Sequence, residues 1–190
     1  MDGMDALDAA GVRLVELVGQ VGPEQWGNPT PCTEWTVRTL VGHLIAGTQG
    51  YCELLKGAPA ARLRSMLERQ SEAVGTDPVA ALQSAVRALR AAFAEPGALE
   101  RTVHHRVDIP GSQLLAFWIG DAVVHSWDLA TAVGVDPGLD EQLVELVYGY
   151  YAPIAQYAGA LYTTGWFAAP TRPLSEGATP LEQLIHLVGR

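Results

Sequence analysis

The feature that most constrains the fold of this chain is an acidic residue and a histidine four positions apart in an otherwise apolar stripe. Asp121 and His125 share a helical repeat with apolar residues, namely Leu114, Leu115, Trp118, Ala122 and Leu129. A carboxylate and an imidazole on a core-facing stripe lose their water, which is costly unless they are paired, hydrogen-bonded or bound to a metal. The sequence therefore predicts a buried polar site on a helix.

A second helical stripe also carries a histidine among small and apolar residues: Thr36, Leu40, His43, Leu44 and Gly47. Because two helices each direct a ligand-type side chain inward, we hypothesise one shared metal site in the core of a helical bundle. Its ligands would be His43, Asp121 and His125. Asp121 and His125 are four positions apart, which places their Cβ atoms about 5–6 Å from each other, and His43 would come from the neighbouring helix. Two imidazoles and a carboxylate suit zinc first, with nickel or iron as alternatives, better than magnesium or calcium.

The spacing leaves a second interpretation open, a buried and hydrogen-bonded Asp–His pair that holds no metal. Acidic residues and histidines occur four positions apart by chance in many helices. A lone histidine such as His43 on an apolar face is also more often a core residue than a ligand. The residues alone do not decide between these two interpretations.

Composition and charge exclude several classes of protein. With 190 residues, 48% hydrophobic and 17% charged, the chain is expected to form one domain, residues 1–190, with a substantial core. A net charge of −9 without a basic cluster argues against nucleic-acid binding. No apolar run approaches the ~20 residues of a membrane span. The acidic N-terminus and only two cysteines indicate a cytoplasmic protein. Monomer and homodimer both remain open.

Hydrophobic periodicity predicts a mainly α chain, a bundle of about four long helices with one short extended arm. Thr33 is expected to cap the second helix, and Asp77 followed by Pro78 to start the third. Alternating residues over 102–109 predict one extended strand. The helices are expected over residues 5–18, 33–55, 60–76 in part, 77–94, 111–133, 139–158 and 181–188.

Several other residues have both a functional and a structural interpretation. Cys32, just before a helix, could be a nucleophile or a packing residue. One of His104 and His105 could face a pocket as an acid–base group, or both could be structural. Asp128 could orient His125 from three positions away, or bond another helix end. Arg172 could contact an anion. The tryptophans are expected in the core or lining a groove: Trp35, Trp118, Trp127 and Trp166.

Two long segments, residues 28–44 (NPTPCTEWTVRTLVGHL) and residues 121–134 (DAVVHSWDLATAVG), resemble the signature of an actinobacterial family. That family is the mycothiol-dependent maleylpyruvate isomerase N-terminal domain, within the DinB-like superfamily. The ending, residues 184–190, is similar to the family's closing helix, so the resemblance spans nearly the whole chain. It implies an up-down-down-up four-helix bundle with a divalent metal at one end of the core, and it matches His43, Asp121 and His125 to the ligands. It also makes Cys32 part of the turn that enters the second helix.

The resemblance implies an enzyme with a small-molecule substrate and mycothiol as thiol cosubstrate. The metal would act as a Lewis acid that lowers the pKa of the thiol, for S-transfer or for addition–elimination isomerisation of an electrophile. The characterised isomerase has glutamate where this chain has Asp121, and it carries a further C-terminal domain. We therefore expect a member of the stand-alone branch, with S-transfer favoured and no acid–base residue identified. The alternatives are a non-catalytic metal-binding or small-ligand-binding protein and a metal-hydroxide hydrolase on the same three residues.

Overall fold

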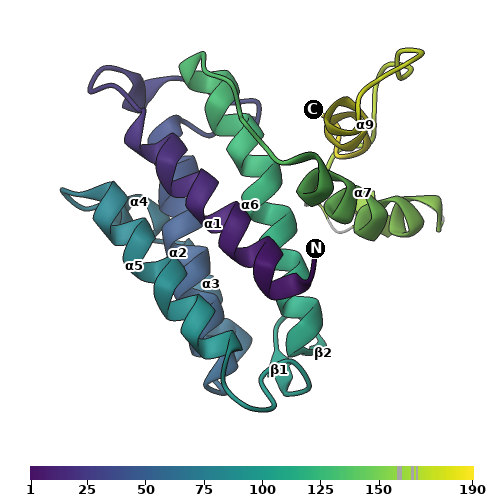
Figure 1. Cartoon of the computed structure of the whole chain (residues 1–190). Coiled ribbons are helices and arrows are strands. Elements are labelled where there is room, and N and C mark those ends of the chain that lie inside the picture. The colour runs from purple at the N-terminus through teal and green to yellow at the C-terminus, as the bar shows by residue number, and fades with distance from the viewer. Residues whose placement is uncertain (158–159, 164, 166) are drawn as a thin grey trace. The chain divides into compact units, whose positions relative to one another are not determined.

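The computed structural model describes residues 1–157, 160–163, 165 and 167–190 (Figure 1). The chain divides into two units, residues 2–137 and residues 138–190. That both belong to one domain stays a prediction. Trp166 and the expected end of a helix at Ala158 lie outside the described residues.

Four long helices form the bundle of residues 2–137. They are α1 (Gly3–Gly19), α2 (Val37–Leu55), α5 (Pro78–Phe93) and α6 (Gly111–Val133). Each packs on two others, α1 on α5 and α6, and α2 on the same two helices. The inward stripes supply a leucine-rich core, with Leu7, Leu14, Leu40, Leu54, Leu82, Leu89, Leu114 and Leu129 at most 1% exposed. Burial of these stripes is what holds the helices side by side.

The helix directions follow from which residues meet. Gly11 lies against Val86, so that the middle of α1 meets the middle of α5, and Gly19 lies against Val79 nearer the start of α5. These two helices are therefore antiparallel. The short helices α3 (Ala60–Leu67) and α4 (Gln70–Ala73) carry the chain back along α2, which leaves α2 and α5 parallel. The expected up-down-down-up bundle is confirmed.

The start of α2 differs from the expected one. Thr36, not Thr33, is the N-cap, and its hydroxyl accepts a hydrogen bond from the Thr39 backbone N–H. Glu34 has φ of 69°, a left-handed conformation that interrupts any helix begun at Thr33. The other two boundary predictions are confirmed, since Asp77 caps α5 and a left-handed Gly134 ends α6.

The segment before α6 forms a hairpin rather than the single extended strand that the alternation predicts. A three-residue strand β1 (Thr102–His104) pairs antiparallel with β2 (Asp108–Pro110), with Val103 opposite Ile109. Val107, expected to alternate inward, is instead in the turn and 69% exposed. The side chains of His104 and Asp108, directly opposite each other, bond at 2.7 Å across the pair.

The helices α2 and α6 share a buried polar contact inside the bundle. Trp118 Nε1 donates to Thr48 Oγ1 at 2.9 Å, and the same hydroxyl donates to the Leu44 carbonyl at 2.6 Å. Every polar atom of this contact therefore has a partner, which removes the penalty for burying it.

Residues 138–190 contain three helices among the residues described. These are α7 (Glu141–Gln156), α8 (Ala160–Thr163) and α9 (Pro180–Leu187), with α7 packed on α8 and α9. A capping box of Thr179 and Glu182 begins α9, one residue before the expected start. In neither unit is a described helix long and apolar enough to cross a membrane.

Candidate metal centre

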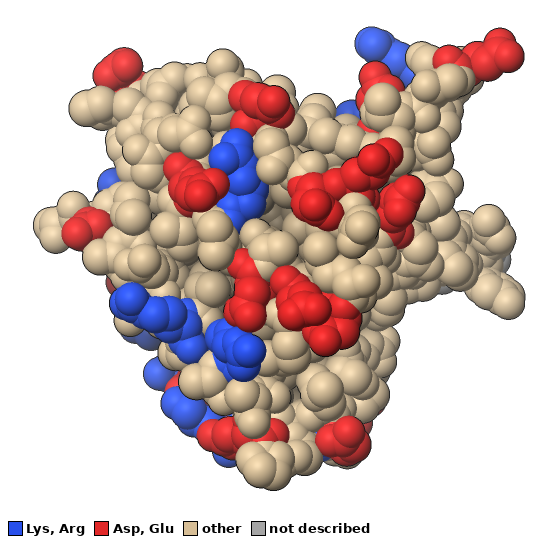
Figure 2. Space-filling model, in the orientation of Figure 1, with Lys and Arg blue, Asp and Glu red and all other residues tan. Residues whose placement is uncertain are grey.

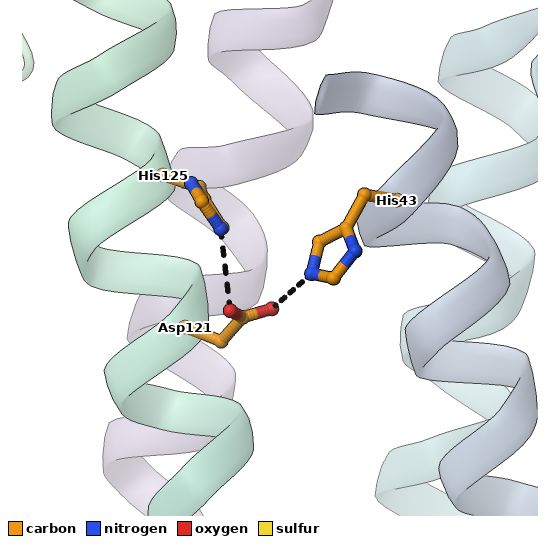
Figure 3. A group of neighbouring side chains, drawn as sticks. All are labelled: His43, Asp121 and His125. Atoms are coloured by element: carbon orange, nitrogen blue, oxygen red, sulfur yellow. Dashed lines mark hydrogen bonds and ion pairs between the residues drawn. The ribbon is translucent and has the colours of Figure 1, made fainter. Parts of the chain in front are cut away.

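The three residues singled out in the sequence meet between α2 and α6 (Figure 3). The Asp121 carboxylate lies between two imidazoles, with Oδ2 3.3 Å from His43 Nε2 and Oδ1 3.3 Å from His125 Nε2. One ligand-type atom from each residue lies within 4.8 Å of the other two. Two helices far apart in sequence therefore bring two nitrogen donors and one carboxylate to a single point.

The three side chains differ in their access to solvent. The side chain of His125 is 9% exposed and that of His43 is 18% exposed, whereas that of Asp121 is 39% exposed. The imidazoles thus belong to the wall of the site, and solvent reaches it through the carboxylate. The Asp121 side chain, although shorter than a glutamate, contacts both imidazoles.

Asp128 holds the second nitrogen of His125. Its carboxylate is fully buried, and Oδ2 lies 2.9 Å from His125 Nδ1. A carboxylate accepts hydrogen bonds, so His125 donates through Nδ1 and keeps Nε2 directed at the site. This contact matches the first of the two roles considered for Asp128, orientation of the imidazole.

Charge pairing shifts the protonation of the centre. Burial by itself lowers the pKa of His125, but Asp121 and Asp128 outweigh it and raise that pKa to about 9. Burial raises the pKa of Asp121, but His125 and His43 hold that pKa well below its usual range. Without a metal, the centre is therefore an imidazolium–carboxylate arrangement at neutral pH.

Trp35, one of the tryptophans expected in the core or lining a groove, forms an aromatic wall beside the centre. Its ring centroid lies 4.8 Å from that of His43 and 5.7 Å from that of His125. The left-handed Glu34 directly before it turns the chain ahead of the Thr36 cap. Trp35 lies in an irregular segment, where hydrophobic periodicity carries no information.

The two histidines of the hairpin, His104 and His105, are not part of the group of three. His104 is exposed and paired with Asp108. His105 is buried, 6.0 Å from Tyr51 and 5.7 Å from Phe117 between ring centroids, and this burial lowers its pKa. His104 lies in β1 and His105 in the turn that follows it, and the two differ in burial. An acid–base role for either stays a prediction.

Neither cysteine is part of the group of three. Cys32 is half-buried, and Cys52 is buried in α2, where burial raises its pKa to about 11. Such a thiol stays protonated and unreactive at neutral pH. Arg172 is exposed in residues 138–190, and its contact with an anion stays a prediction.

The donor set fits a first-row divalent metal. Bonds of about 2.0–2.2 Å at tetrahedral angles place neighbouring ligand atoms roughly 3.3–3.5 Å apart. Each imidazole Nε2 lies 3.3 Å from a different oxygen of the Asp121 carboxylate, and one ligand atom from each residue lies within 4.8 Å of the other two. Three protein ligands would leave one or more positions for exogenous ligands. The same contacts also describe a hydrogen-bonded group without metal, so geometry alone permits both interpretations.

Comparison with known proteins decides the family. The family model of the mycothiol maleylpyruvate isomerase N-terminal domain matches residues 7–130, a range that includes all three residues. The chain belongs to this family. Its motifs at residues 28–44 and 121–134 had indicated the same one. It is also 31% identical to the uncharacterized protein Rv0738 of Mycobacterium tuberculosis, over 100% of this chain and 98% of the relative.

Solved structures show the same fold. The crystal structure of the mycothiol-dependent maleylpyruvate isomerase matches with a TM-score of 0.64 at 14% identity, over 79% of this chain and 66% of that one. A mutant of that isomerase matches with a TM-score of 0.66 at 14% identity, over 88% and 72%. This chain thus spans about two thirds of the length of the solved isomerase. At this identity the likeness establishes the bundle alone.

Proposed function

We propose that this protein is a divalent-metal-dependent enzyme that activates a low-molecular-weight thiol toward a small electrophile. By family the thiol would be mycothiol, and the reaction isomerisation by addition and elimination, or S-transfer. The observation that carries the proposal is the convergence of His43, Asp121 and His125, with ligand-type atoms within 4.8 Å, in a chain of this family.

In the proposed centre His43 and His125 supply Nε2, and Asp121 supplies a carboxylate oxygen. A bound zinc, nickel or iron ion would supply Lewis acidity, which lowers the pKa of a thiol and polarises a substrate oxygen. To bind it, His125 gives up the Nε2 proton while it keeps its Nδ1–H bond to Asp128. Asp128 thereby maintains the orientation of the imidazole before and after metal binding.

The surroundings of the three residues fit substrate entry from one side. Trp35 packs against both imidazoles, whereas Asp121 is the most exposed of the three. Thiol and electrophile would therefore approach past the carboxylate.

The first experiment is elemental analysis of the purified, untagged protein beside His43→Ala and His125→Ala. The matched control is His104→Ala, because His104 is also paired with an aspartate but lies outside the group of three. We expect about one metal ion per chain in the wild type and the control, and loss in both test variants. A wild type that stays metal-free after reconstitution contradicts the proposal and leaves a structural Asp–His group.

The second experiment tests thiol dependence with the metal-loaded protein, mycothiol and a panel of electrophiles that begins with maleylpyruvate. Turnover that requires the thiol supports the proposal. Turnover without any thiol indicates a hydrolase. Metal and ligand binding without product indicates a binding protein.

A further inference from the structure

The α1 and α5 helices form an exposed groove away from the candidate metal centre. It has a volume of about 450 Å³, and its apolar floor is formed by Val12, Val15 and Val86. Gly11 allows the close approach of the two helices, because a Cβ atom there would lie 2.6 Å from Val86 Cγ1. Val12 is 60% exposed, which is unusual for a valine on the face of a bundle helix.

Opposite charges flank this apolar floor. The α1 side carries Asp8 and Glu16, whereas the α5 side carries Arg87 and Arg90. Figure 2 shows basic side chains gathered over α5 and mostly acidic ones over α1, where Glu16 pairs with Arg13 at 3.2 Å. Arg90 pairs with Asp8 at 3.3 Å, whereas Arg87 has no ion-pair partner in the part of the chain that the structure describes. The groove face is thus apolar at its centre, acidic along one edge and basic along the other.

We propose that this face binds a second copy of the same chain, as a two-fold symmetric dimer. A two-fold axis parallel to the helices places α1 of one copy over α5 of the other at matching heights. Asp8 then faces Arg90 of the partner subunit, and Val12 enters the partner's groove beside Arg87. A two-fold axis perpendicular to the helices would instead place α1 of one copy on α1 of the other, with acidic side chains facing acidic side chains. Charge complementarity therefore favours the axis parallel to the helices.

The charge of the whole chain also favours this face. Two copies that each carry a net charge of −9 repel each other over most of their surface. The two acidic and two basic residues at the groove balance each other, so repulsion is smallest there. The exposed valine supplies apolar area that loses water on contact.

The test is the mass of the untagged, metal-loaded protein by sedimentation equilibrium from about 5 to about 200 µM, a range suited to weak dimers. We expect a shift from 20.3 kDa toward twice that value, and Val12→Arg should weaken association at least about tenfold, because it places a second positive charge beside Arg87 of the partner subunit. The control is Val107→Arg, a similarly exposed valine in the hairpin turn, which should leave association unchanged.

A charge swap tests the arrangement itself. Asp8→Arg and Arg90→Asp should each weaken self-association, and a mixture of the two variants should associate like the wild type, because Asp8 faces Arg90 of the partner subunit in this arrangement. Circular dichroism confirms that the variants are folded. A wild type that is monomeric at 200 µM overturns the proposal, and binding of a fluorescent apolar dye to that monomer would indicate a small-molecule occupant. A dimer that survives Val12→Arg, or a mixture that does not associate, also overturns it.

Discussion

The α2–α6 and α1–α5 contacts lie in one bundle but differ in what they bury. Between α2 and α6 lie His43, Asp121 and His125, and the Thr48–Trp118 bond beside them. Between α1 and α5 the floor is apolar, and the polar groups, such as Asp8 and Arg90, stay at the exposed edge. An exposed ion pair contributes about 0–1 kcal/mol, whereas an unpaired buried polar group costs roughly 1–3 kcal/mol. The first contact therefore requires a defined geometry, and the second tolerates change.

The largest effect is expected from removal of an imidazole at the α2–α6 contact. His125→Ala should abolish metal retention and leave two carboxylates, Asp121 and Asp128, without their shared partner. Metal content after gel filtration and thermal unfolding of the metal-free protein measure both effects. Arg90→Ala at the α1–α5 contact is the comparison, with metal retained and stability changed by no more than about 1 kcal/mol. Equal effects of the two variants would remove the distinction between the contacts.

The next largest effect is expected from pH. The pKa of His125 is raised to about 9, so a metal must displace a proton below that pH, and its affinity should rise by up to about tenfold per pH unit from 6.5 to 9. In the metal-free protein, the stability of the fold should change with pH in the opposite direction. The raised pKa stabilises the fold fully below about 6.5, and this contribution is lost as the pH rises through about 9. Chelator competition and thermal unfolding give the two profiles, and a flat affinity profile would contradict the assignment of His125.

A smaller effect is expected from the residue behind the histidine. Asp128→Asn keeps a hydrogen-bond acceptor for His125 Nδ1 but removes the charge, and metal affinity should fall roughly 10–100-fold. Asp108→Asn is the matched control, because Asp108 also bonds a histidine, His104, but on the surface. Titration with a competing chelator measures both. Unchanged affinity in Asp128→Asn would mean that its carboxylate charge does not tune His125.

The smallest effect is expected from loss of the hydrogen bond between Thr48 and Trp118, next to the candidate metal centre. Thr48→Val preserves the shape of the side chain but leaves Trp118 Nε1 without its acceptor, which should destabilise the protein by about 1–3 kcal/mol. Metal affinity should change little, because neither residue is a proposed ligand. Urea unfolding measures the loss. Wild-type stability would show that this hydrogen bond contributes nothing net to the α2–α6 contact.

Much of this architecture could be predicted because each long helix buries one apolar stripe. The same reasoning located the candidate centre, because a polar residue on an apolar stripe needs a polar partner. His43, Asp121 and His125 are such residues, and they contact one another. The role of Asp128 could be stated only as one of two options. Three positions along a helix are compatible with contact, but tertiary packing decides it.

The irregular segments were predicted less well. The left-handed Glu34 moved the cap of α2 to Thr36, and glutamate carries no local signal for that conformation. A hairpin forms in place of the expected extended arm because a short turn at residues 105–107 reverses the direction of the chain. The alternation of apolar and polar residues does not indicate such a turn. Trp35 reached both imidazoles through that same irregular segment.

The end of α6 is held by side chains from a much earlier part of the chain. Gln25 Nε2 donates to the Val133 carbonyl and Asn28 Nδ2 to the Ala132 carbonyl, each at 3.0 Å, across 108 and 104 residues. A nascent chain on the ribosome has no such acceptors until α6 has emerged to its last turn. Asp121 and His125 lie on the same helix, so the three residues of the centre can meet only after most of the bundle has been synthesised.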